Sequence, residues 1–325
     1  MLNRFRWTIV CLAVAGSLML AVAMGQTSRS ARTPLTMQTA GVRSLVCHDP
    51  STIVKCDDEY WVFYTGNGVR SAHSKDLITW QPGPASGALT APAWVAAAVP
   101  NNRRNKFWAP DVMKVGNRYF LYHAVSSFGS PISAIGLATS PTLDPKDPAY
   151  KWTDRGIVIQ SQRADNFNAI DPAIARGADG GMWRCFGSFW SGIKLIQLDP
   201  ATGPRIAPDS QIYSLAHYSS IEASYIYHHD QYYYLFVNWG RCCRGANSTY
   251  NIRVGRSEKI TGPYLDKTGI DMMKDGGSLV LDSEDKFIGP GHAGIVEVDE
   301  REWFSFHYEA DARAQRAGHP SAELG

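Results

Sequence analysis

Ionisable side chains recur at one place in five similar segments of this chain. The aligned starts of the segments are Asp49, Ala109, Asp171, Glu222 and His292. Only 19% of all residues are charged, so four ionisable side chains at these five positions exceed what chance would place there. Neighbouring carboxylates raise one another's pKa and cost stability, so a sequence that keeps them indicates a functional site. Strand capping or a structural ion is the alternative explanation.

Three carboxylates suit the hydrolysis of a glycosidic bond. One carboxylic acid would protonate the leaving oxygen, one carboxylate would activate water or attack, and the third would hold the acid's proton by repulsion. The sequence shows no serine elbow and no phosphate-binding loop. Trp108, Phe128 and Trp190 could offer flat faces to sugar rings, although each is also a candidate for the core. The carboxyl separation that distinguishes inversion from retention stays open.

Each segment predicts a β-hairpin that would position these side chains. The turns DDE, GN, ADGG, HHD and DERE contain the Gly, Asn and Asp residues that tight hairpins require. The runs YWVFY, RYFLY and YYYLF alternate as strands with one buried face do. No stretch shows a sustained helical period, so the chain is predicted to be all-β.

The repeat of these hairpins predicts a five-bladed β-propeller. Strand-like runs such as SAIGLATS and YNIRVGRS follow the hairpins, which gives roughly four strands per repeat, as in a propeller blade. A β-sandwich is the competing architecture, but its strands would not repeat one motif. The first strand of each blade lines the central channel, so the aligned side chains are expected to meet there.

The ends and the charge restrict the location and the partners of the protein. Residues 1–25 read as a signal peptide, with Arg4 and Arg6 before an apolar run and small residues at its end. An uncleaved anchor is the alternative. Residues 26–325 would then form a single catalytic domain with no net charge, because the segment removes two of 32 basic and none of 30 acidic residues. We therefore expect a secreted protein, extracellular or periplasmic, that binds neither nucleic acid nor membrane after processing.

Five cysteines follow the predicted signal peptide, and their spacing predicts neither a disulfide framework nor a zinc site. Cys242 and Cys243 are adjacent in the sequence. Two interpretations stay open for this pair: a vicinal disulfide formed in an oxidising compartment, or two buried thiols.

Several motifs together resemble glycoside hydrolase family 43, and within it the endo-acting arabinanases. They are HDPSTIV, WAPDV, NAIDPAI, GSFWSGIKLIQLDPATG, SIEASYIY, NWGRCCRGANSTYNIRVGRS and IGPGHAG, in order between about Cys47 and Tyr308. The resemblance implies a five-bladed propeller that hydrolyses α-1,5-linked arabinan with inversion. It implies that Asp49 is the general base, Glu222 the general acid, and Asp171 the residue that raises the pKa of the acid.

The resemblance also implies roles for residues around the acids. His48 would support the base, and the residues that would line the sugar subsites are Trp108, Phe128, Asn168 and Ser188. His292 would help hold a metal ion, a calcium with mostly water ligands, because calcium prefers oxygen to a lone imidazole. A hydrogen-bonding histidine without metal is the alternative.

Two departures from the family pattern are visible. Ala223 stands where the family commonly has a proline, and the chain ends in HPSAELG without the expected closing strand. The last blade is therefore predicted to be incomplete, with an exposed edge. Arabinan or its oligosaccharides are the expected partner of a monomeric enzyme. The alternatives are an exo-acting α-L-arabinofuranosidase or β-xylosidase, a non-catalytic carbohydrate-binding propeller, and a retaining sucrose or fructan hydrolase.

Overall fold

The computed structural model describes residues 45–85, 87–103, 105–285, 287–309 and 322–324. These described residues all belong to one compact unit. The predicted signal peptide lies outside the described residues. None of the helices in the described part of the chain has the length and apolar character that a membrane span requires.

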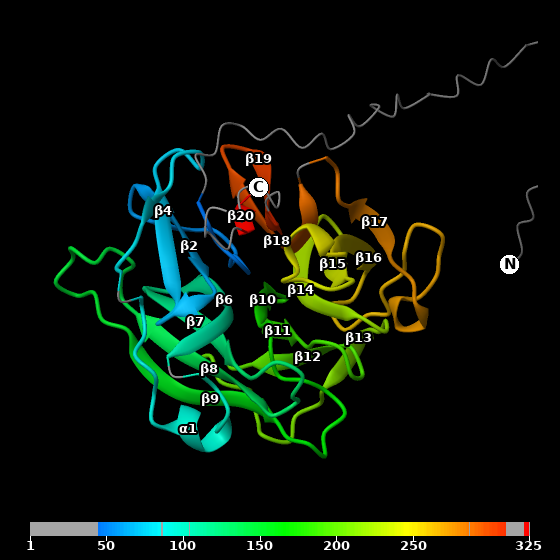
Figure 1. The fold of residues 1–325 in the computed structure, drawn as a ribbon, viewed down its shortest axis with the longest axis horizontal. Helices are drawn as coiled ribbons and strands as arrows, with labels where there is room; N and C mark the ends of the chain where they lie inside the picture. The colour runs from blue at the N-terminus through cyan, green and yellow to red at the C-terminus, as the bar shows by residue number, and fades with distance from the viewer. Residues whose placement is uncertain (1–44, 86, 104, 286, 310–321, 325) are drawn as a thin grey trace, which may run out of the picture. The chain divides into compact units, whose positions relative to one another are not determined.

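The described residues form antiparallel sheets that surround a common centre (Figure 1). The first sheet contains β1 (Val54–Cys56), β2 (Glu59–Tyr64), β4 (Arg70–Ser74) and β5 (Gln81–Pro82). The second contains β3 (Gly66–Asn67), β6 (Lys106–Val115), β7 (Arg118–Val125), β8 (Ser133–Ser140) and β9 (Thr153–Ser161). The third contains β10 (Ala173–Arg176), β11 (Met182–Phe186), β12 (Ile193–Leu198) and β13 (Tyr213–Ala216).

Two further sheets follow along the chain. The fourth contains β14 (Ile221–His229), β15 (Tyr232–Trp239), β16 (Asn251–Ser257) and β17 (Ser278–Leu281). The last contains β18 (Ile288–Val298), β19 (Arg301–Glu309) and β20 (Ala322–Leu324). The helices are short: α1 (Trp94–Ala98), η1 (Gly245–Asn247) and η2 (Met272–Lys274).

This arrangement is an all-β propeller, but it corrects the predicted count of five blades. Four sheets have four or five strands each and are complete blades. The sheet that starts at Ile288 has three strands among the described residues, and β20, which pairs with β19, forms its edge. Residues 310–321, on which the prediction of a missing outer strand partly fell, lie outside the described residues.

The predicted hairpin turns are confirmed, and their backbone explains the residue types. Asp57, Gly116, Asp230 and Asp299 follow the first strand of their hairpins with φ between 51° and 58°. Asp and Gly tolerate this left-handed region, and two-residue turns that match the twist of the paired strands require it.

Apolar side chains fill the spaces between neighbouring sheets. One cluster of buried residues, which includes Phe63, Phe107 and Leu121, joins the first and second sheets. Another joins the second and third sheets. Val296 and Val298 of β18 pack against a cluster of the first sheet, so apolar contact connects the last sheet to the first.

One buried carboxylate connects the inner strands of three sheets. Asp111 of β6 is 3% exposed, and its Oδ1 accepts a hydrogen bond of 2.9 Å from the Thr52 amide before β1. Its Oδ2 accepts one of 2.7 Å from the Ile174 amide of β10. Burial raises the pKa of Asp111, while the amide donors oppose this rise. The Asp111 carboxylate thus supplies the acceptor for two backbone amides, those of Thr52 and Ile174.

We predict that Asp111→Ala destabilises the propeller. The substitution leaves two buried amide groups without their acceptor, which costs about 2 to 4 kcal/mol. Urea unfolding followed by tryptophan fluorescence measures the change, and Asp209→Ala is the control, since Asp209 is exposed. Equal stability of the two variants would contradict this role of Asp111.

Candidate active site

The inner strands begin with a backbone feature that aims side chains at the propeller centre. Five residues at the repeat starts have φ between 39° and 60°: Asp49, Ala109, Asp171, Ala223 and His292. The strand register shifts at this point in β6, β14 and β18. Such bulges redirect side chains and are frequent beside active sites.

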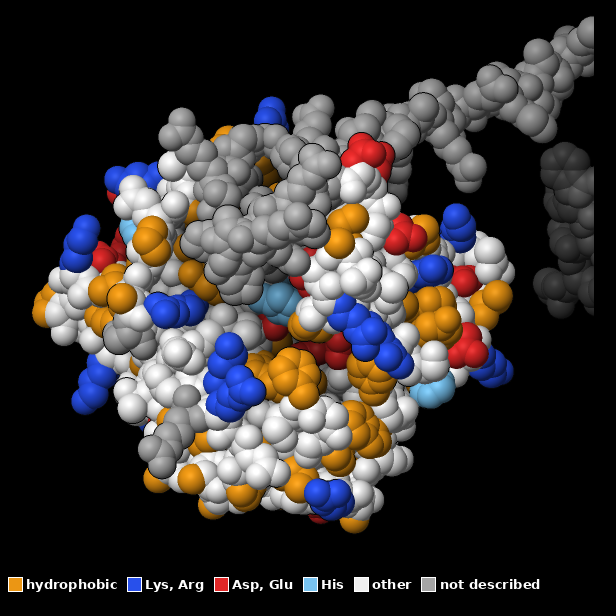
Figure 2. Space-filling view, viewed as in Figure 1, with side chains coloured by type: hydrophobic (Ala, Val, Ile, Leu, Met, Phe, Trp, Pro, Cys, Tyr) orange, Lys and Arg blue, Asp and Glu red, His pale blue; other side chains and the backbone are white. Residues whose placement is uncertain are grey.

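This feature corrects the aligned start of the fourth segment by one residue. Ala223 occupies the position equivalent to Asp49 and Asp171, and Glu222 precedes it. The Ala223 amide donates a hydrogen bond of 3.1 Å to Asp171 Oδ2. This bond holds the backbone next to Glu222 against Asp171, so Glu222 still lies in the cluster. Figure 2 shows acidic side chains in a hollow at the centre of this face, bordered by hydrophobic side chains.

Asp49 is held as a carboxylate. Its Oδ1 lies 2.7 Å from His48 Nδ1 and 3.5 Å from His292 Nδ1, and its Oδ2 accepts a hydrogen bond of 2.6 Å from Thr65 Oγ1. Burial by itself raises the pKa of Asp49, but the charges and hydrogen bonds of the two histidines outweigh it and hold this pKa well below its usual value. The ionised form is therefore the stable form at neutral pH.

Asp171 and Glu222 retain a proton to higher pH. Burial raises the pKa of Asp171 to about 8, and the neighbouring Glu222 carboxylate adds to the rise. Burial also raises the pKa of Glu222, although hydrogen bonds from Ser188 and Tyr250 oppose it. Ser188 Oγ donates to Glu222 Oε2 over 2.6 Å, and the Tyr250 hydroxyl donates to Oε1. Two coupled carboxyl groups share their titration, so the pair carries a proton while Asp49 does not.

His307 of the last sheet contacts Asp49 and His48. Its Nδ1 accepts a hydrogen bond of 3.1 Å from the Asp49 amide, and its ring stacks on His48 with 4.4 Å between centroids. Burial holds the pKa of His307 well below its usual value, and nearby His48 lowers it further. A neutral ring that accepts at Nδ1 fits this contact.

The predicted sugar-contacting residues lie in different surroundings. Trp108 is half-buried and its ring lies 4.9 Å from that of Phe128, which is 82% exposed. Ser188 contacts Glu222 directly. Asn168 is buried, and its Oδ1 accepts a hydrogen bond of 2.6 Å from Ser133. Phe128 and Asn168 thus lie outside the hydrogen-bonded cluster of the acids.

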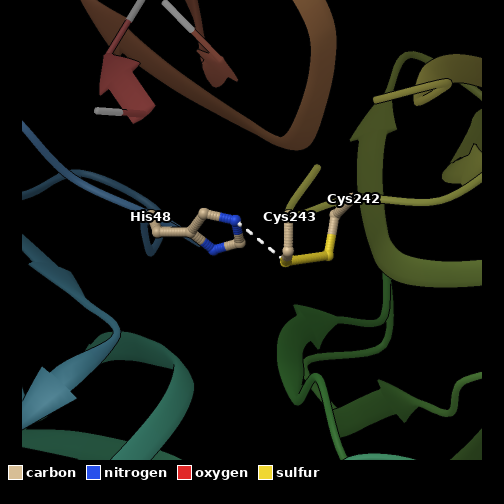
Figure 3. Close-up of side chains that lie close together, drawn as sticks. All are labelled: His48, Cys242 and Cys243. Carbon is tan, nitrogen blue, oxygen red and sulfur yellow. Dashed lines mark hydrogen bonds between the residues drawn. A yellow bond between two sulfur atoms is a disulfide. The ribbon is translucent and has the colours of Figure 1, made fainter. Parts of the chain in front are cut away.

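A vicinal disulfide borders His48. Cys242 and Cys243 are bonded to each other, so the interpretation as two buried thiols is wrong. Cys243 Sγ lies 3.4 Å from His48 Nε2, and Figure 3 shows the imidazole pointing at this sulfur. Glu309 positions the loop, because its carboxylate accepts hydrogen bonds from the amides of Cys243 (2.7 Å) and Gly245 (3.2 Å).

The donor atoms around His292 do not form a calcium cage. Its Nδ1 faces Asp49, and its amide donates to Asn238 Oδ1 over 2.9 Å. Among the described residues, three potential ligand atoms come within 4.8 Å of one another in two groups, His48–Cys242–Cys243 and His48–Asp49–His307, and neither includes His292. Both groups are rich in nitrogen or sulfur, whereas calcium takes six to eight oxygen ligands.

Sequence reasoning missed several residues that support the acids. Thr65 follows the aromatic run of the first hairpin, and its Oγ1 also accepts a hydrogen bond of 2.8 Å from the Ala109 amide. Tyr250 and His307 come from strand-like runs that predicted only packing. A polar residue within each run was the only local signal, because the contacts join segments that are distant in sequence.

Comparisons with known proteins identify the family of this chain. The model of the glycosyl hydrolases family 43 matches residues 40–323. An extracellular endo-α-(1→5)-L-arabinanase 1 of Bacillus subtilis is 41% identical over 265 residues, 79% of each chain. An extracellular exo-α-(1→5)-L-arabinofuranosidase of Cellvibrio japonicus is 39% identical over 288 residues, 83% of this chain and 81% of the relative.

A solved structure extends the similarity to the fold. The α-L-arabinanase of Cellvibrio cellulosa complexed with arabinohexaose superposes with a TM-score of 0.80 at 36% identity, over 87% of this chain and 91% of that one. The propeller fold and these relatives together identify a glycoside hydrolase. The chain belongs to family 43 of the glycosyl hydrolases.

We predict that Thr65→Val lowers kcat/KM for the hydrolysed polysaccharide by up to about 100-fold, because a displaced reactive group is costly. The side chain keeps its shape but loses the donor to Asp49 and the acceptor for Ala109. Thr153→Val on the outer strand β9 is the matched control. An unchanged rate in Thr65→Val with an intact fold would exclude a positioning role for Thr65.

We also predict that a dithiol lowers the activity severalfold. Reduction of Cys242–Cys243 takes up two electrons and two protons and removes the fixed contact of Cys243 Sγ with His48. The measurement is the hydrolysis rate against the number of thiols titrated. A Cys242→Ala/Cys243→Ala variant controls for other effects of the reagent. Full reduction without loss of rate would contradict the prediction.

Proposed function

We propose that this enzyme hydrolyses internal α-1,5-arabinofuranosidic bonds of arabinan with inversion of configuration. One observation carries the proposal: Asp49 contacts two imidazoles that hold its pKa well below its usual value, whereas burial raises the pKa of Asp171 and Glu222. Such a difference between carboxyl groups supplies a general base and a general acid in one cleft. The printed names of the relatives supply the substrate class.

Asp49 is the proposed general base. Its carboxylate would take a proton from water as that water attacks the anomeric carbon. His48 and His292 stabilise the charge of Asp49 and orient its Oδ1, and Thr65 orients Oδ2. A base of this kind contributes roughly 10²- to 10⁴-fold to the rate.

Glu222 is the proposed general acid, and Asp171 modulates its pKa. The two carboxyl groups share their titration, so exposure decides which one reaches the substrate. Asp171 is 9% exposed and bonded to the Ala223 amide, whereas Glu222 is half-buried. Glu222 would therefore protonate the leaving oxygen, and Ser188 and Tyr250 would steady its carboxyl group.

The sugar subsites are proposed along the mouth of the hollow. Trp108 and Phe128 offer adjacent aromatic rings, of which Phe128 is exposed enough to stack on a sugar. Ser188 would hold both the acid and a sugar hydroxyl. Asn168, which is buried, would act through the shape of the loop that leads into Asp171.

Two further parts of the prediction are kept as proposals. A largely hydrated calcium ion beside His292 is testable by the metal content of the purified protein, and no step depends on it. Secretion through residues 1–25 agrees with the extracellular relatives.

An exo-acting enzyme is the second candidate, because one relative is named an exo-α-(1→5)-L-arabinofuranosidase. Product chromatography on linear arabinan distinguishes the two: the endo mode releases a series of short arabino-oligosaccharides early in the reaction. Early release of a single short product would favour the exo mode.

Two further measurements test the mechanism. Proton NMR of the reducing end that forms first tests inversion of configuration. Loss of all turnover in Glu222→Ala tests the role of Glu222 as the general acid.

We predict that Asp171→Asn moves the basic limb of the pH–rate profile to lower pH. The first ionisation of the Asp171–Glu222 pair leaves a negative charge that opposes the second one. With Asn at position 171 this charge is absent, so Glu222 loses its proton at lower pH. The measurement is kcat/KM against pH on linear arabinan, with Asp209→Asn as an exposed control. A basic limb that does not move would remove the modulating role from Asp171.

A further inference from the structure

A small pocket lies in the outer half of the second sheet, away from the acids. It has a volume of about 230 Å³, and its wall includes Thr90, His123, Ala138, Tyr150, Trp152 and Asp154. His123, Ala138 and Asp154 belong to β7, β8 and β9, the outer strands of this sheet, whereas the acid cluster adjoins inner strands. Helix α1 contacts β9 near the pocket (Figure 1).

The inner end of the pocket is a buried imidazole whose polar atoms have no protein partner. His123 is 0% exposed, and neither Nδ1 nor Nε2 has a hydrogen-bond partner among the described residues. Burial lowers the pKa of His123 to about 3, so the ring is neutral and contributes shape rather than charge to this end of the pocket. Buried polar groups are normally satisfied, so this ring requires an explanation.

The surroundings hold this imidazole in place. Trp94 stacks on the ring at 6.1 Å, and Phe107 meets it edge-on at 4.8 Å. Gly136 of β8 leaves room for both rings, because a Cβ there would lie 2.8 Å from His123 Nε2 and 2.5 Å from the Trp94 ring. The sequence therefore keeps space for a polar ring at the end of the pocket.

The walls combine aromatic faces with hydrogen-bonding groups. Tyr150 OH accepts a hydrogen bond of 3.2 Å from Trp152 Nε1, so its own hydrogen is free to donate. Asp154 Oδ1 accepts from Trp94 Nε1 over 3.2 Å, which fixes an acceptor at the mouth. Trp152 is itself braced edge-on by Phe63 at 5.7 Å. Aromatic faces with a few fixed donors and acceptors suit a neutral polyhydroxylated ring.

We propose that this pocket binds one pentofuranosyl unit of the polysaccharide and anchors the polymer while another part of it is hydrolysed at the central site. The choice of sugar rests on the proposed function. The volume lies below the roughly 300 Å³ at which pockets for drug-sized ligands begin, so one ring fits and a chain does not. The neutral His123 and the carboxylate of Asp154 disfavour an anionic ligand.

A binding measurement tests the pocket independently of catalysis. Methyl α-L-arabinofuranoside is titrated into the full chain and followed by ligand-observed NMR, and crystals are soaked with the same sugar. Electron density for a sugar ring beside Trp152 and His123 is expected. Thr90→Trp at the mouth should remove this part of the binding, and Ala97→Trp, exposed on α1 outside the pocket, should retain it. Ordered water alone in the pocket overturns the proposal, whether or not the protein cleaves arabinan.

A rate comparison tests the anchoring. Thr90→Trp and Asp154→Ala should each lower kcat/KM on long linear arabinan severalfold and leave kcat/KM on arabinotriose unchanged, because a short substrate cannot reach both sites. Ala97→Trp should change neither value. Equal rates of Thr90→Trp and the control on the polymer overturn the anchoring. Absence of turnover by the unmodified chain on both substrates would instead contradict the proposed function.

Discussion

The electrostatic coupling of buried carboxyl groups with imidazoles is the interaction on which the active site depends. Burial raises the pKa of Asp49, Asp171 and Glu222 alike, because an apolar surrounding disfavours charge. Only Asp49 contacts two histidines, and their charge reverses the effect for this residue. The pKa of Asp49 is thus lowered and those of Asp171 and Glu222 are raised within one cluster, which is the difference that the proposed mechanism uses.

The propeller makes this coupling possible by bringing short strand starts together. A left-handed residue begins the inner segment of each repeat and turns side chains toward the centre. Asp111 and Thr65 then join neighbouring sheets through hydrogen bonds to backbone amides. The acids are therefore positioned by contacts between sheets rather than within one sheet, which links the geometry of the site to the closure of the ring.

A second layer holds the imidazoles. His307 stacks on His48 and accepts the Asp49 amide, and the disulfide lies against the far nitrogen of His48. Glu309 fixes the loop that carries the disulfide. The His48 imidazole is enclosed on both sides and has little freedom to rotate. The orientation of Asp49 therefore depends on residues that do not touch the substrate in the proposed mechanism.

Local pattern determined much of this protein. The hairpin turns and the alternating strands follow from neighbouring residues, because turns and strand faces are short-range properties. The repeat of one motif singled out Asp49, Asp171 and Glu222, and the family resemblance implied the support of Asp49 by His48. Tertiary structure decided the rest. His307 meets Asp49 across 258 residues, and a bulge shifts Glu222 by one position. Among the described residues the last sheet has three strands, and this pairing was not visible in the local spacing.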